Sequence, residues 1–131
     1  MVLKQSFDDF LDQWIDIESE YWETSAYIKS TMKKYLRSTD MLGKSMVLMW
    51  FDAKTEQNFG KFQDIGDWVF FTSVYLPGSI PCDPEFYQSV GRSSYYRCYR
   101  MLDGAWPVYE ELADRFHDFV EQLAGREGIE C

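Results

Sequence analysis

Apolar residues recur at helical spacing in the first part of the chain, which predicts two amphipathic helices. Behind Ser6, a favourable N-cap residue, the first apolar stripe consists of Phe7, Phe10, Leu11 and Trp14. The second helix is predicted to begin at Ser19 and to end near residues 38–40. Its stripe consists of Tyr21, Ile28, Met32, Tyr35 and Leu36.

Helix boundaries are clearest in the last third of the chain. Asp83 and Pro84 form an N-cap followed by proline at the first helical position, so we predict a helix from there to about Leu102, ending at Gly104. Small side chains at Gly91, Ser94 and Cys98 lie on nearly one line of this helix and favour close approach of another element. A final helix is predicted from Pro107 to Gly125, with a core stripe of Leu112, Phe116, Phe119, Val120 and Leu123.

Two apolar segments, residues 46–51 and 68–75, have no period that separates helix from strand. The β-branched and aromatic content of residues 68–75, taken alone, favours a strand. Gly66 and Asp67 are interpreted as a turn plus an N-cap, and the length and flanks of the segment also allow a buried helix over residues 67–76 that Pro77 and Gly78 close. The fold class predicted is all-α, a compact single-domain bundle of five to six helices over residues 1–131. The alternative is an α+β fold with two short strands at 46–51 and 68–75.

Composition narrows the class of protein. The chain has 131 residues, of which 46% are hydrophobic and 18% aromatic, so it buries enough apolar area to fold. Its longest apolar run, residues 46–51, is far shorter than the roughly 20 residues of a membrane span. The N-terminus does not resemble a signal peptide. We therefore expect a cytoplasmic protein without membrane contact.

Charge is unevenly distributed. The net charge is -9, but residues 24–102 carry ten basic and seven acidic residues, whereas both ends are strongly acidic. Because an acidic protein repels phosphate backbones and no basic stripe with interleaved aromatics is present, nucleic acid is not an expected partner. The odd number of cysteines and their spacing (Cys82, Cys98, Cys131) argue against a disulfide framework and against a zinc site. Cys98 is expected to be a buried thiol.

No pattern in the sequence indicates catalysis or a cofactor. The only histidine, His117, falls on one stripe of the predicted last helix with Glu110, Asp114 and Glu121. Carboxylates and histidine at such spacing hold metals in helical bundles, but this stripe faces away from the Phe116 and Val120 core face. A solvated helix face is the favoured interpretation, and a metal site is the alternative.

Aromatic residues exceed what one small core consumes, and several lie beside arginines between residues 87 and 100. Tyr, Trp and Arg dominate protein interfaces, so this segment indicates a surface for a protein partner or for self-association. The alternative is an aromatic-lined small-ligand pocket with polar orienting groups. The candidate interaction or pocket residues are Asp67, Tyr87, Arg92 and Tyr96.

One region resembles a family of uncharacterised bacterial proteins. The shared pattern is a Gly-Asp pair, an apolar run and a proline, then two Tyr before a Gly-Arg pair and Ala-Tyr; here it corresponds to residues 65–71, 76–77, 86–87 and 91–95. Phe86 stands in place of the first Tyr and Ser94 in place of the Ala. The resemblance spans about residues 20–124 and implies a mostly helical cytoplasmic protein without an established activity.

These observations predict a non-enzymatic interaction or regulatory protein that binds another protein or itself. A small-ligand or metal-binding helical protein that uses a bundle pocket is the alternative.

Overall fold

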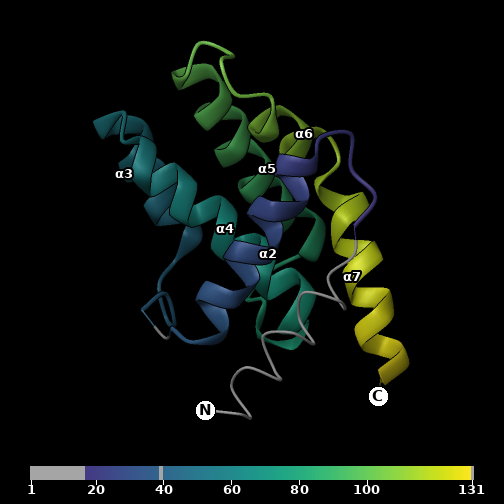
Figure 1. Cartoon of the computed structure of the whole chain (residues 1–131). Coiled ribbons are helices and arrows are strands. Elements are labelled where there is room, and N and C mark those ends of the chain that lie inside the picture. Colours follow the sequence, from purple (N-terminus) through teal and green to yellow (C-terminus); the bar gives the residue numbers. More distant parts are fainter. Residues whose placement is uncertain (1–16, 39, 131) are drawn as a thin grey trace.

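The computed structural model describes residues 17–38 and 40–130, which form helices and no strand (Figure 1). The α-helices are α2 (Trp22–Leu36), α3 (Met46–Glu56), α4 (Phe59–Tyr75), α5 (Pro84–Met101), α6 (Val108–Asp114) and α7 (Phe116–Glu130), and a short 3-10 turn spans Pro77–Ser79. The predicted all-α bundle is confirmed. Both ambiguous segments are helical, since 46–51 lies in α3 and 68–75 in α4. The helix predicted behind Ser6 lies outside the described residues.

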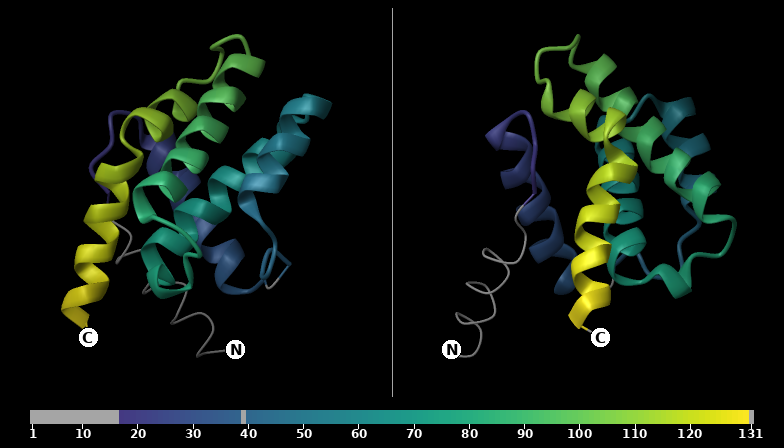
Figure 2. Two further views of the ribbon diagram at one scale, coloured as in Figure 1. Left: turned by 180° about the vertical axis from the view of Figure 1, so that it is seen from behind. Right: turned by 90° about the vertical axis from the view of Figure 1, so that its right-hand side faces the viewer.

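Helix α4 is the centre of the bundle. It contacts α2, α3, α5 and α7, and Figure 2 shows α2 and α5 on opposite sides of it. Every residue from 65 to 74 is buried. A helix that is covered on all sides needs no polar face, which explains why this segment has no amphipathic period in the sequence.

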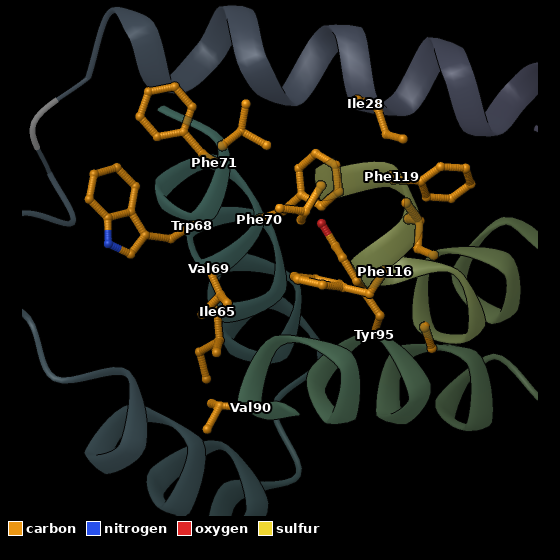
Figure 3. Close-up of a cluster of buried hydrophobic side chains, with 14 of the residues drawn as sticks. Ile28, Ile65, Trp68, Val69, Phe70, Phe71, Val90, Tyr95, Phe116 and Phe119 are labelled. Atoms are coloured by element: carbon orange, nitrogen blue, oxygen red, sulfur yellow. The ribbon is translucent and has the colours of Figure 1, made fainter. Parts of the chain in front are cut away.

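The core is built from apolar, mostly aromatic side chains that α2, α5 and α7 bring to α4 (Figure 3). Phe70 of α4 packs edge-to-face against Phe116 of α7, with ring centroids 5.3 Å apart. Tyr95 of α5 lies 5.9 Å from the same Phe116 ring. Ile28 brings α2 to this cluster. Such geometries add to the stabilisation that burial of the rings already gives.

Glycines allow α4 and α5 to approach each other closely. A Cβ atom added at Gly91 would lie 2.8 Å from Cγ1 of Val69 and 2.9 Å from Cζ of Phe116, which confirms the predicted close-packing role. A Cβ added at Gly66 would lie 2.7 Å from Cε1 of Tyr95. The predicted turn and N-cap at Gly66 and Asp67 are therefore wrong, because both residues lie in the interior of α4, with Gly66 against the Tyr95 ring.

The observed helix ends agree with the predicted ones where the capping residue is close in the sequence to the groups that it caps. Asp83 Oδ2 accepts a hydrogen bond from the backbone N–H of Phe86 at 3.1 Å, and Gly104 adopts a φ of +73° just beyond α5. The start of α4 differs from the predicted residue 67. It is capped by Asn58, whose Oδ1 accepts from the N–H of Lys61 at 3.1 Å.

The predicted last helix is two helices. The chain leaves helical geometry at Arg115, between α6 and α7, and α7 continues through Gly125 to Glu130. The Arg115 guanidinium binds Glu111 on one side of the break and Asp118 on the other. Leu112 of α6 and Phe116 of α7 are both fully buried, so the change of direction brings both helices onto the core.

Candidate functional site

Asp67 is the centre of a polar cluster inside the bundle. Its side chain is buried, and Oδ1 accepts hydrogen bonds from the hydroxyls of Tyr27 and Tyr95, each at 2.7 Å. The cluster continues outward, since Gln63 donates to the Tyr109 hydroxyl at 2.7 Å and Tyr109 donates to Tyr27 at 3.5 Å. These bonds link α2, α4, α5 and α6 through one carboxylate.

Burial controls the protonation of this cluster. It raises the pKa of Asp67 to about 6, although the hydrogen bonds from Tyr95 and Tyr27 favour the charged form. Burial, together with the nearby Asp67 charge, also raises the pKa of Tyr27 and of Tyr95, so both hydroxyls remain donors at neutral pH. The arrangement satisfies buried polar groups and holds helices together, which is a structural role.

A groove on the opposite face of α5 has a different character. We call it the cationic groove; it lies between α3 and α5, encloses about 680 Å³, and is lined by Lys54, Gln57, Phe62, Ser93, Tyr96, Arg97, Arg100 and Met101. Three of these side chains are basic and three are aromatic or apolar. All three cations come from the basic middle of an acidic chain.

Aromatic rings hold the cations of the groove in place. The Arg97 guanidinium lies 5.3 Å from the ring centroid of Trp50 and 5.8 Å from that of Phe62. Lys54 lies 5.5 Å from the Trp50 ring, and Arg100 lies 5.9 Å from the Tyr96 ring. Within the described part of the chain, none of these cations forms an ion pair with a carboxylate. Aromatic rings therefore hold these cations in place, and no carboxylate among the described residues neutralises their charge.

The four predicted site residues lie in four different surroundings. Asp67 belongs to the buried cluster, and Tyr96, 46% exposed, lines the cationic groove. The Arg92 Nε donates to the carbonyl of Ala113 at 3.1 Å, and Arg92 lines a second pocket of about 590 Å³ beside His117. Tyr87 is buried against Thr72 at a third pocket. Arg92 and Tyr96 therefore do not share one face for a ligand.

Lys54 and Phe62 are residues of the cationic groove that sequence analysis missed. They come from α3 and α4, and they meet α5 only through tertiary packing. The spacing of Trp50 and Lys54, four residues apart on α3, is a local signal that the cation covers the aromatic ring.

The stripe around His117 is divided by the break at Arg115. Glu110 and Asp114 lie on α6, whereas His117 and Glu121 lie on α7, where His117 Nε2 is 2.9 Å from Glu121 Oε1. Gln88 is 3.0 Å from the other ring nitrogen. Among the described residues, no group of three or more His, Cys, Asp or Glu side chains is placed to hold a metal ion.

Glu111 is a buried carboxylate that the sequence pattern places only near a helix start. It accepts hydrogen bonds from the backbone N–H groups of Glu20 and Tyr21, which precede α2, and binds Arg115 at 3.3 Å. It therefore fixes the start of α2 to α6. Cys98 is fully buried as predicted, and burial raises the pKa of its thiol to about 12.

Comparisons with protein-family models, with curated proteins and with solved structures found no match for this chain. The resemblance of residues 65–95 to a bacterial family stays a prediction. None of the helices in residues 17–38 and 40–130 combines the length and the apolar character needed to cross a bilayer.

Proposed function

We propose that this protein is a cytoplasmic, non-enzymatic interaction protein that binds an acidic segment of a partner protein in the cationic groove. The observation that carries the proposal is a set of three cations, Lys54, Arg97 and Arg100, which lie beside the exposed ring of Tyr96 and have no carboxylate partner among the described residues. The free thiols of Cys82 and Cys98 fit a reducing compartment.

Carboxylates are the chemistry that best matches the groove. A guanidinium binds a carboxylate through two parallel hydrogen bonds, and Arg97 is already held against Trp50 and Phe62. Because the side chain is pre-positioned, binding costs less conformational entropy than it would for a free surface arginine. Tyr96 and Met101, both partly exposed, offer apolar contact to side chains between the carboxylates.

A protein segment fits the groove better than nucleic acid does. The net charge of -9 repels a polyphosphate backbone, and three cations in a short groove neutralise few phosphates. A short peptide presents its own carboxylates without the long-range repulsion of a duplex. Because the contacts are charged and exposed, binding should weaken as salt concentration rises.

A labelled peptide that alternates Glu with Leu tests the proposal by fluorescence anisotropy at low salt. The peptide should bind, whereas a matched peptide with Gln in place of Glu should not. Arg97→Ala should weaken binding at least about ten-fold, the effect of losing a charge-assisted contact. Arg92→Ala is the matched control, because this arginine of the same helix lies at another pocket. Equal loss in both variants, or equal binding of both peptides, would refute the assignment to the groove.

Self-association is the competing use of the groove, since the two ends of this chain are themselves acidic. Native mass spectrometry of the purified protein separates the two cases. A monomer supports a foreign partner. A dimer that Arg97→Ala dissociates identifies a second copy as the occupant and overturns the assignment to another protein.

A further inference from the structure

A third pocket lies beside Trp68 and Thr72 of α4. We call it the apolar pocket; it encloses about 400 Å³ between α4, the start of α5 and the segments 42–47 and 79–82. Its apolar wall includes Leu42, Val47, Trp68 and Pro81. The volume lies within the range of about 300–1,000 Å³ typical of small-ligand sites.

The buried hydroxyl groups of Thr72 and Tyr87 form a small polar region in this pocket. Thr72 and Tyr87 are both almost fully buried, and Thr72 Oγ1 lies 2.8 Å from the Tyr87 hydroxyl oxygen. Thr72 Oγ1 also lies 2.9 Å from the carbonyl oxygen of Trp68, which only accepts hydrogen bonds. The pattern that uses both hydroxyl hydrogens has Thr72 donating to the Trp68 carbonyl and Tyr87 donating to Thr72.

The direction of the hydrogen bonds between Tyr87, Thr72 and the Trp68 carbonyl determines which group the pocket presents to a ligand. Both hydrogens are used inside the protein, and the remaining lone pair of the Tyr87 oxygen is an acceptor. Burial raises the pKa of Tyr87, so the phenol keeps its proton at neutral pH. The pocket therefore combines an apolar wall with one buried acceptor, besides the exposed hydroxyls of Ser45 and Ser79, and a ligand needs one donor to complement the buried acceptor.

We propose that the apolar pocket binds a small apolar molecule that carries one hydrogen-bond donor, of the aromatic alcohol class, with its donor on the hydroxyl oxygen of Tyr87. The site is separate from the cationic groove and does not depend on the proposed function. Lys44 lines the pocket and is exposed. A carboxylate-bearing ligand would use Lys44 instead, and the test below includes this case.

The exposed thiol of Cys82 lines the pocket and reports its occupancy. Alkylation by iodoacetamide, followed by peptide mass spectrometry, measures the reactivity of Cys82, with the buried Cys98 as the internal reference. The probes are 1-naphthol, naphthalene and 1-naphthoate. We expect 1-naphthol to protect Cys82 at about five-fold lower concentration than naphthalene, the ratio that one hydrogen bond gives.

The decisive variant is Tyr87→Phe made together with Thr72→Val, because it keeps the ring and removes both the phenol oxygen and the Thr72 oxygen that Tyr87→Phe alone would leave as a new acceptor. It should bind 1-naphthol and naphthalene equally, with naphthalene protection unchanged from the wild type. Val47→Phe, which narrows the pocket and keeps Tyr87, should reduce protection by both probes. The proposal is overturned if 1-naphthol does not protect Cys82, if 1-naphthoate protects it better, or if the variant with both Tyr87→Phe and Thr72→Val keeps the preference for 1-naphthol.

Discussion

The buried cluster around Asp67 and the cationic groove use the same kinds of side chain in opposite ways. Both combine tyrosines with charged groups, and α5 supplies neighbouring residues to each, Tyr95 to the cluster and Tyr96 to the groove. In the cluster the carboxylate accepts two hydrogen bonds at 2.7 Å. In the groove the cations rest on aromatic rings without a carboxylate partner in the described residues. The presence of partners, and not the residue type, separates a structural site from a candidate recognition site.

The largest expected effect is the loss of the buried carboxylate. Asp67→Ala leaves the hydroxyls of Tyr27 and Tyr95 without their acceptor, and each orphaned hydroxyl costs about 1–3 kcal/mol. We expect the free energy of unfolding to fall by about 2–4 kcal/mol, measured by urea denaturation. A fall below about 0.5 kcal/mol would contradict the structural role of the cluster.

The neighbouring tyrosines of α5 give a matched pair. Tyr95→Phe removes one of the two hydrogen bonds to a charged group and should cost about 1.5–3 kcal/mol of unfolding free energy. Tyr96→Phe, at an exposed position, should change it by less than about 0.5 kcal/mol. Comparable costs for the two variants in the same denaturation experiment would remove the distinction between cluster and groove.

We expect a smaller change in the unfolding free energy from the protonation of Asp67. The pKa of Asp67 rises from 3.8 to about 6 on folding, so the native state binds more protons than the unfolded state between these values. This contribution to stability is present below about pH 4 and is lost as pH rises through 6. Asp67→Asn removes it.

Urea denaturation at pH 4 and pH 7 measures this contribution. The decrease in unfolding free energy between the two pH values should be smaller in Asp67→Asn than in the wild type by about 2 kcal/mol, since most of the shift of about two pKa units, at about 1.4 kcal/mol each, is expressed between them. Equal decreases in the two proteins would show that the native pKa of Asp67 is not raised.

The smallest effect on stability is expected in the groove. Arg100 is exposed and lies against the Tyr96 ring, so Arg100→Ala should change the unfolding free energy by less than about 0.5 kcal/mol. The same urea titration measures it. A decrease in the unfolding free energy of more than about 1 kcal/mol would mean that Arg100 stabilises the fold, which contradicts its role as a binding residue alone.

The sequence predicts those parts of the fold that local chemistry determines. Asp83 and Pro84 begin α5 and Gly104 follows its end, because capping and positive φ depend on neighbouring residues alone. Gly66 and Asp67 give a wrong helix start when they are interpreted from the sequence alone. A glycine also allows a ring to pack on a helix, and a buried aspartate also accepts hydrogen bonds from hydroxyls that are distant in the sequence. The partners that decide between these roles, Tyr27 and Tyr95, lie far away in the sequence.

The residues of the cationic groove can be predicted only in part from the sequence, for the same reason. Tyr96 was identified from the aromatic and arginine content of one helix, but Arg92 was grouped with it although its guanidinium reaches the carbonyl of Ala113. Lys54 and Phe62 complete the groove from α3 and α4. A surface assembled from three helices has no signature in any one of them.

A charge reversal in the groove tests the central claim most directly. The Arg100→Glu variant should lose affinity for the labelled Glu-Leu peptide and gain affinity for a matched Lys-Leu peptide, while its thermal midpoint stays close to that of the wild type. A change of preference from the Glu-Leu to the Lys-Leu peptide would show that the bound peptide contacts the side chain at position 100. If Arg100→Glu binds the Glu-Leu peptide as the wild type does, the cationic groove is not the recognition site.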